Sequence, residues 1–180
     1  SIPIHGGEKV TLRLLETSTE TGLAEIFSPD SPIVGYLEKL VNKDTKDGGI
    51  VLLSGPTGSG KSTTMAAIMR AVPRHRKNVL TIENPVEYRI PLARQIEVNP
   101  DRGQKFASVI RAVMRHDPDV IGIGEMRDAE TAEAAMNAAE TGHLVVSTVH
   151  AIGAIPTIER SLSLFAENYR TFVAGESDAM

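Results

Sequence analysis

The sequence contains no cysteine and no tryptophan, and aromatic residues make up only 4% of its 180 residues. Without cysteine, the chain can form neither disulfides nor thiolate zinc sites, and it has no cysteine nucleophile. Basic residues are not in excess either, because 19 Lys and Arg stand against 23 Asp and Glu, which gives a net charge of −4. We therefore expect no direct binding of nucleic acid through a global positive field.

Long hydrophobic runs are absent as well. No stretch approaches the roughly 18 to 20 apolar residues that span a bilayer, and the first residues lack the basic-then-apolar pattern of a signal peptide. The sequence thus predicts a cytoplasmic protein with no transmembrane segment. Because the chain starts at Ser1 and opens on a strand-like segment, we expect it to be part of a longer protein.

Short apolar runs alternate with helical patterns along most of the chain. Buried strands are expected at 50–54, 78–82, 119–124 and 143–149, with a further strand at 94–98. Helices are expected at 61–72, 104–116, 128–140 and 153–166, and another begins near Pro32. Continuous apolar runs are typical of strands covered on both faces of a parallel sheet, and the alternation indicates right-handed crossovers. We therefore predict an α/β fold with a mostly parallel sheet flanked by helices.

The first 29 residues depart from this alternation. Residues 8–15 (EKVTLRLL) predict a short strand, so residues 1–15 would be the end of a preceding domain. The polar, turn-rich stretch 16–29 predicts a linker. The main domain is expected over 30–180.

A phosphate-binding loop is indicated at residues 55–62, which fit the pattern G-x-x-x-x-G-K-[ST] directly after a strand and before a helix. Backbone N–H groups of such a loop, with the positive end of the following helix, surround a phosphate. Lys61 would reach the β- and γ-phosphates of ATP, and the Ser62 hydroxyl would bind Mg²⁺. A glycine-rich turn without a ligand is the alternative. The residues expected to bind nucleotide here are Gly55, Thr57, Gly58, Ser59, Gly60, Lys61, Ser62 and Thr63.

Polar residues follow the later strands, at the edge of a parallel sheet where ligands bind. Residues 83–87 follow one strand, residues 125–128 follow the next, and His150 follows the last. A hydrolytic site needs a carboxylate that holds a metal, one that orients water and a group that senses the γ-phosphate. These segments can supply all three.

Four motifs in order resemble those of the secretion ATPases of type II secretion systems and type IV pili, including the pilus retraction motors. The motifs are GPTGSGKST (55–63, Walker A), TIENPVEY (81–88, Asp box), GIGEMRD (122–128, Walker B) and TGHLVVSTVH (141–150, His box). The resemblance implies a RecA-like P-loop NTPase domain, truncated at its C-terminus and preceded by the remnant of a PAS-like domain. It also implies a ring-shaped homo-hexamer that hydrolyses ATP with Mg²⁺, and that is held at the inner membrane by a platform protein.

The resemblance implies a role for each residue that stands at a matching motif position. Glu87, the last acidic residue of the Asp box, would polarise the attacking water. Glu125 of the Walker B motif would hold Mg²⁺ together with Ser62, and His150 would lie near the γ-phosphate. Of the two His-box histidines, His143 is more simply explained as structural.

Three arginines also have counterparts in the family. Arg111 and Arg115 resemble residues that approach the nucleotide or an adjacent subunit, although a spacing of four also suits an exposed helical stripe. Arg13 resembles one that reaches the phosphates from the small domain. Asn84 is a departure, because the family usually has Asp there.

Other functions stay open on the sequence alone. One is a conjugation-related or RecA-like DNA translocase, although the acidic balance and few aromatics disfavour strand binding. Another is a nucleotide-binding module with little activity. A small-molecule kinase is disfavoured because no Arg-rich lid insertion is visible.

Overall fold

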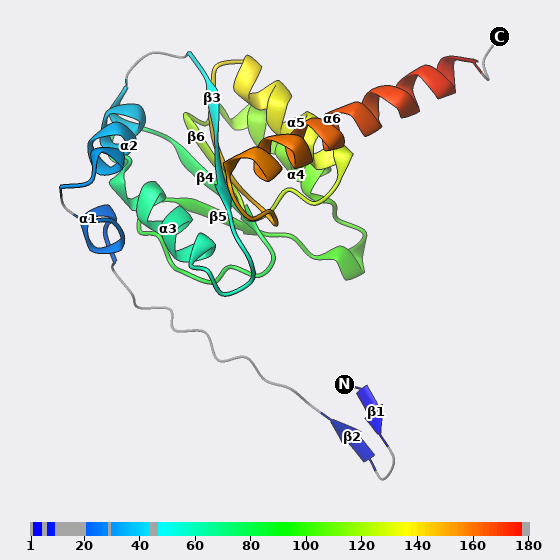
Figure 1. Ribbon diagram of the computed structural model, residues 1–180, viewed down its shortest axis with the longest axis horizontal. Coiled ribbons are helices and arrows are strands. Elements are labelled where there is room, and N and C mark those ends of the chain that lie inside the picture. The colour runs from blue at the N-terminus through cyan, green and yellow to red at the C-terminus, as the bar shows by residue number, and fades with distance from the viewer. Residues whose placement is uncertain (1, 5–6, 10–20, 29, 44–46, 178–180) are drawn as a thin grey trace.

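Five parallel strands form the central sheet (Figure 1). They are β3 (Gly49–Ser54), β4 (Val79–Glu83), β5 (Arg94–Glu97), β6 (Val120–Ile123) and β7 (Leu144–Val149), in the order β3-β7-β6-β4-β5. All four pairings between neighbours are parallel. The predicted α/β fold with a mostly parallel sheet is confirmed.

Helices cover both faces of the sheet (Figure 1). On one face lie α1 (Leu23–Ile26), α2 (Pro32–Asn42) and α3 (Lys61–Ala71), and on the other α4 (Phe106–Val113), α5 (Ala129–Glu140) and α6 (Ala154–Ser177). Two 3-10 turns, Pro100–Arg102 and Met114–His116, flank α4. Among the described residues, no helix is both long and apolar enough to cross a bilayer.

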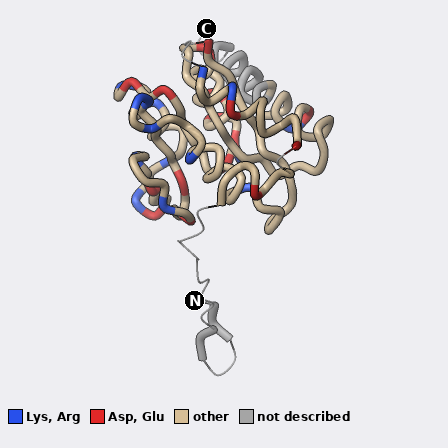
Figure 2. Tube along the Cα trace, turned by 90° about the vertical axis from the view of Figure 1, so that its left-hand side faces the viewer, with Lys and Arg blue, Asp and Glu red and all other residues tan. Residues whose placement is uncertain are grey.

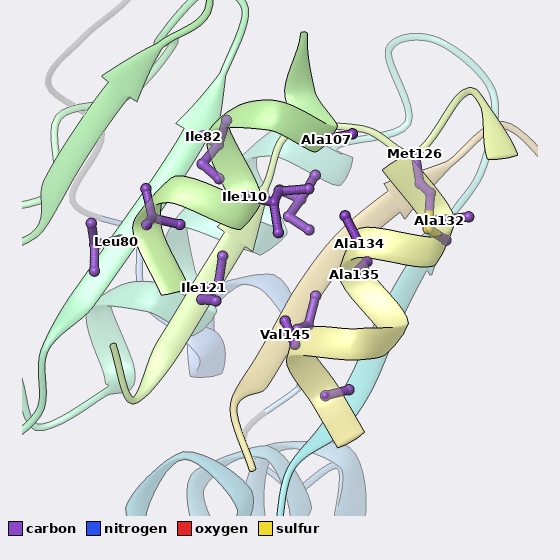
Figure 3. Close-up of a cluster of buried hydrophobic side chains, with 14 of the residues drawn as sticks. Leu80, Ile82, Ala107, Ile110, Ile121, Met126, Ala132, Ala134, Ala135 and Val145 are labelled. Carbon is purple, nitrogen blue, oxygen red and sulfur yellow. The ribbon is translucent and has the colours of Figure 1, made fainter. Parts of the chain in front are cut away.

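Two hydrophobic cores, one on each face, explain the continuous apolar runs in the sequence. Successive side chains of a strand point to opposite faces, so both sets must be apolar when both faces are covered. On β6, Val120 packs with α2 and α3, whereas Ile121 packs with α4 and α5. Figure 3 shows the second core, in which Ile121 of β6, Ile110 of α4 and Ala135 of α5 lie together.

The beginning of the chain differs from the sequence-based prediction. The structure, a computed structural model, describes residues 2–4, 7–9, 21–28, 30–43 and 47–177. Where one strand was expected, β1 (Ile2–Ile4) pairs antiparallel with β2 (Gly7–Lys9), and the rest of the predicted strand lies outside the described residues. Within the predicted linker, α1 forms and buries Leu23.

Helix α1 was missed because its signal is a single turn. Leu23, Ile26 and Phe27 are a short apolar group inside a polar stretch, and one turn is too short to show a helical period. The structure shows what stabilises it: the Glu25 carboxylate accepts a hydrogen bond from the Gly22 N–H (3.2 Å), and Leu23 enters the core beside α3. Helix α6 also runs further than the predicted 153–166.

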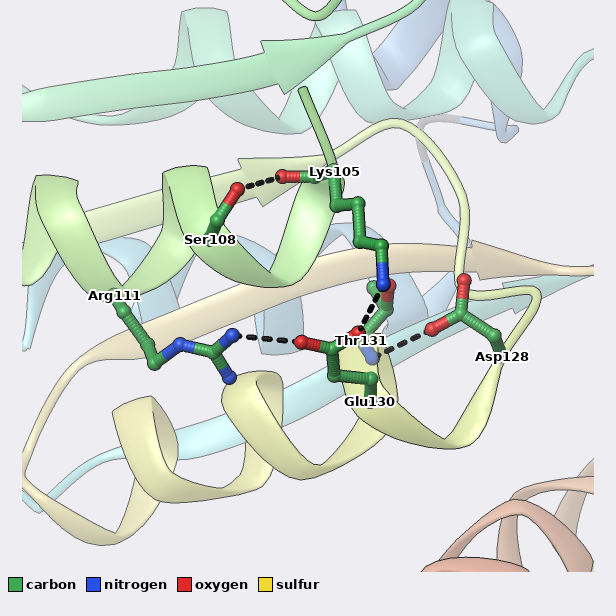
Figure 4. Close-up of polar contacts among 6 residues, drawn as sticks. All are labelled: Lys105, Ser108, Arg111, Asp128, Glu130 and Thr131. Atoms are coloured by element: carbon green, nitrogen blue, oxygen red, sulfur yellow. Dashed lines mark hydrogen bonds and ion pairs between the residues drawn. The ribbon is translucent and has the colours of Figure 1, made fainter. Parts of the chain in front are cut away.

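Charges of both signs are interspersed along the described part of the chain (Figure 2). One cluster joins α4 to α5: Glu130 accepts a hydrogen bond from Arg111 (2.7 Å) and another from Lys105 (3.3 Å) (Figure 4). The Asp128 carboxylate caps α5 by accepting from the Thr131 N–H (2.8 Å). The hydrogen bonds from Arg111 and then Lys105 lower the pKa of Glu130.

Removal of a buried side chain from β6 should destabilise the fold strongly. Ile121 is 0% exposed, so Ile121→Ala should lower the free energy of unfolding by about 2 to 5 kcal/mol. The matched control Ile155→Ala removes the same atoms from a side chain on α6 that is 71% exposed. It should change the free energy of unfolding by less than about 0.5 kcal/mol. Chemical denaturation of both variants measures the difference. Equal effects would contradict the described core.

Loss of the strongest partner of Glu130 should raise the pKa of that carboxyl. Because the pKa of Glu130 is lower in the folded chain than in the unfolded chain, the two ion pairs stabilise the fold at pH values above the ordinary carboxyl pKa. This stabilisation is lost as the pH falls through the pKa that Glu130 has in the folded state. Carbon NMR of the Glu130 carboxyl should therefore give a higher pKa in Arg111→Ala, and a smaller rise in Lys105→Ala. An unchanged pKa in Arg111→Ala would show that the pair does not form in solution.

Candidate nucleotide-binding site

The carboxyl ends of the strands border an open cavity of about 370 Å³. Five segments line it: the phosphate loop with the start of α3, the Asp box, the Walker B motif, the end of the His box, and Phe106 at the start of α4. The cavity lies within the size range of small-molecule sites. The predicted site residues that line it are Thr57, Gly58, Gly60, Lys61, Ser62, Thr63, Glu87, Glu125 and His150.

The phosphate loop depends on glycines at two kinds of position. Gly58 (φ +79°) and Gly60 (φ +89°) adopt left-handed conformations that other residues rarely accept. Gly55 also has a positive φ (+155°), and a Cβ there would lie 2.5 Å from the Ser59 Oγ, so that the serine side chain would have to move. The loop therefore turns tightly from β3 into α3.

Lys61 and Ser62 begin α3, where the helix has its positive end. A lysine at this end is unfavourable for the helix alone, and the first turn holds no acidic residue to offset it. The Lys61 ammonium instead donates to two carbonyl oxygens of the loop, those of Gly55 and Pro56, both at 2.8 Å. The positive charge gathered at this point suits an anion such as a phosphate.

The Asp box is tied to α3 and to β5. The hydroxyls of Tyr88 and Thr63 lie 3.0 Å apart, which joins the Asp box to the first turns of α3. Glu83, at the end of β4, is only 6% exposed, and its Oε1 accepts hydrogen bonds from Thr81 (2.7 Å) and Gln95 (3.2 Å). Between these fixed points, the half-buried Glu87 lines the cavity.

Glu125 and His150 lie close together because hydrogen bonds join the ends of β6 and β7. The Met126 N–H donates to the Thr148 carbonyl (2.9 Å), and the Thr148 hydroxyl donates to the Gly124 carbonyl (2.7 Å). The Glu125 carboxylate forms an ion pair with Arg127, and its Oε2 lies 3.9 Å from His150 Nε2. The Walker B glutamate therefore lies between two basic side chains at the cavity wall.

The lining fits Mg²⁺ in the manner typical of nucleotide sites. The Ser62 hydroxyl and the Glu125 carboxylate offer oxygen ligands in one cavity. Within the described ranges, no group of three or more His, Cys, Asp and Glu side chains could hold a metal unaided. Mg²⁺ commonly takes one or two protein oxygens and completes its shell with water and phosphate oxygens, so this sparse set suits it.

The predicted arginines do not line this cavity. Arg111 and Arg115 are exposed, and Arg111 pairs with Glu130 on α5. Arg13 lies outside the described residues. A contact of Arg111 or Arg115 with the nucleotide of an adjacent subunit stays a prediction.

Sequence reasoning missed two side chains that shape the site. Tyr88 closes the Asp box motif, and its motif position is the signal that could have singled it out. Gln95 lies in a predicted strand with no feature that marks it. His143 lies at the other end of β7, where its Nδ1 is 2.8 Å from the Ala138 carbonyl oxygen and 3.0 Å from the Thr141 hydroxyl, in keeping with a structural role.

Comparisons with known proteins agree with this geometry. Residues 1–172 match the family model described as "Type II/IV secretion system protein". The chain is 44% identical to the type IV pilus assembly ATPase PilB of Thermus thermophilus and 39% identical to the type II secretion system protein HxcR of Pseudomonas aeruginosa. The matches cover 89% and 94% of this chain, but only 18% of PilB and 35% of HxcR.

A solved structure is similar in both sequence and fold. The pilus retraction motor PilT with bound ADP is 38% identical, with a TM-score of 0.63, over 87% of this chain and 42% of PilT. The family model, over residues 1–172, includes the phosphate loop and the three later motifs. The chain therefore belongs to the type II/IV secretion system protein family.

Proposed function

We propose that this chain is the catalytic core of a motor ATPase that powers type IV pilus extension or retraction, or type II-like protein secretion. The observation that carries the proposal is the shared cavity, because Lys61, Glu87 and Glu125 come from three separate motifs and line one space. PilB, HxcR and PilT are named for pilus assembly, secretion and pilus retraction, and these names support the same class of activity.

The first step is the binding of ATP by the phosphate loop. The Lys61 ammonium exchanges its carbonyl partners for the β- and γ-phosphate oxygens, which carry more charge and make stronger hydrogen bonds. The positive end of α3 adds to this attraction. Ser62 and Glu125 would hold Mg²⁺, which neutralises charge on the phosphate oxygens when bound.

Hydrolysis then depends on the carboxylate of Glu87. From the Asp box, Glu87 accepts a hydrogen bond from water and orients that water towards the γ-phosphate. Lys61 stabilises the charge that spreads over the phosphate oxygens in the transition state. ADP and phosphate are the products.

His150 is suited to sense the state of the γ-phosphate. Its Nε2 lies 3.9 Å from the Glu125 carboxylate, so a change in charge or in ligands at Glu125 alters the electrostatic environment of the imidazole. Because His150 follows β7, such a change can be passed to the segment that leads into α6. This path would couple hydrolysis to movement.

Assembly is also part of the proposal. A homo-hexameric ring would bring the exposed Arg111 and Arg115 of one subunit near the site of the next, where cationic side chains can raise the rate by ~10³ to 10⁵. A platform protein would hold this ring at the inner membrane, on its cytoplasmic side. Nucleic acid is not expected to bind directly.

Removal of the Lys61 charge should weaken ATP binding. A hydrogen bond to a charged group contributes about 1.5 to 3 kcal/mol, so Lys61→Ala should raise the Kd for Mg-ATP by roughly 10- to 100-fold. Titration calorimetry measures this Kd. Lys39→Ala, a matched change at an exposed position of α2, should leave it unaltered. Wild-type affinity in Lys61→Ala would refute the assignment of the phosphate loop.

The two glutamates should be separable by their kinetics. Glu87→Gln should keep ATP affinity and lose turnover by roughly 10²- to 10⁴-fold, because water orientation matters mainly in the transition state. Glu125→Gln should instead shift the Mg²⁺ concentration needed for half-maximal activity upwards. Phosphate release measured across a Mg²⁺ series distinguishes these results. Unaltered turnover in Glu87→Gln would remove the proposed mechanism.

A further inference from the structure

Gln95 joins β5 to both ends of the turn that carries Glu87. Its Nε2 donates to the Tyr88 carbonyl oxygen (2.8 Å) and to Glu83 Oε1 (3.2 Å), and its Oε1 accepts from the Ile90 N–H (2.9 Å). The Gln95 side chain thus forms hydrogen bonds with three groups within residues 83–90. Gln95 itself does not line the cavity.

The turn is held by alternate residues along β5. Glu97, two residues after Gln95 on the same face of the strand, accepts from the Val86 N–H (3.1 Å). Val86 and Tyr88 are therefore both tied to β5, and Glu87 lies between them. The backbone on both sides of Glu87 is thereby held by β5.

The chemistry of a primary amide explains why glutamine suits this position. Its nitrogen donates two hydrogen bonds and its oxygen accepts others, and here both groups are used. A carboxylate of the same shape would keep the contact with Ile90. It would lose both donated bonds and place a second negative charge beside the Glu83 carboxylate.

We propose that Gln95 is a positioning residue for ATP hydrolysis, which holds the Asp-box turn so that Glu87 meets the attacking water. The inference rests on the proposed role of Glu87. A displacement of about 1 Å at a reacting group can cost ~10²-fold in rate. The Tyr88 hydroxyl contacts Thr63 of α3, but Lys61 is held by carbonyl oxygens of the phosphate loop itself. We therefore expect ATP binding to change little.

The primary experiment compares two glutamines of the same chain. Gln95→Leu should lower the single-turnover rate of ATP hydrolysis by roughly 10- to 100-fold, with the Kd for ATP within about threefold of wild type. Gln104→Leu is the matched control, because Gln104 also accepts from a backbone N–H, that of Asn99 (2.9 Å), in an exposed turn. Its rate should stay within about twofold of wild type.

A second variant separates positioning from folding. Gln95→Glu keeps the shape and the acceptor for Ile90, so the Ile90 amide should remain protected from hydrogen exchange while turnover still falls. In Gln95→Leu the same amide should exchange faster. Wild-type turnover in both variants would overturn the proposal, as would a loss of ATP binding equal to the loss of rate.

A double variant tests whether Gln95 acts through Glu87. Gln95→Leu combined with Glu87→Gln should be no slower than Glu87→Gln alone, because residues that act as a unit are not additive. If the rate losses of the two single variants multiply in the double variant, the inference is overturned. Normal turnover in Glu87→Gln would instead reject the proposed function and this inference together, whereas an inactive Glu87→Gln beside a fully active Gln95→Leu would reject the inference alone.

Discussion

The parallel register of β7 with both of its neighbours is the constraint on which the site depends. Leu144 of β7 pairs with Gly49 of β3 and with Val120 of β6, so three strands leave the sheet at one edge. Hydrogen bonds beyond the strands, from the Gly124 N–H to the Ile82 carbonyl (2.8 Å) among them, extend this alignment into the loops. A slip of one residue would exchange the side chains of the two cores and separate the four motifs.

Glycines within β6 and directly after it make room for a buried polar pair beside the cavity. A Cβ at Gly122 would lie 3.0 Å from the Thr81 methyl, and one at Gly124 would lie 3.4 Å from the Glu83 Cα. The Thr81 hydroxyl can therefore pack within the sheet and donate to the Glu83 carboxylate. Glycine in a strand is costly in itself, and here it permits the close approach that holds the Asp box in place.

The sequence predicted the strands and motif residues, which follow from residue patterns along the chain. It missed the side chains whose role follows from contacts between distant segments. Apolar runs revealed the strands because both faces of the sheet are covered. The motifs pointed to Lys61, Glu87 and Glu125 because these residues lie in the segments that follow those strands. Gln95 carries no such mark, since its importance lies in which backbone groups it meets in space. The ion pair of Arg111 with Glu130, 19 positions away, likewise needed the packing of α4 on α5.

The balance of charge around the cavity bears on how a nucleotide could enter it. Glu83, Glu87 and Glu125 line the same space as Lys61 and Arg127, and one of these cations, Arg127, is already paired with Glu125. A triphosphate added to this lining would meet several carboxylates in a partly enclosed space, where repulsion is stronger than in water. If ATP binds here as proposed, a divalent cation held by Glu125 and the phosphate oxygens would lower this repulsion.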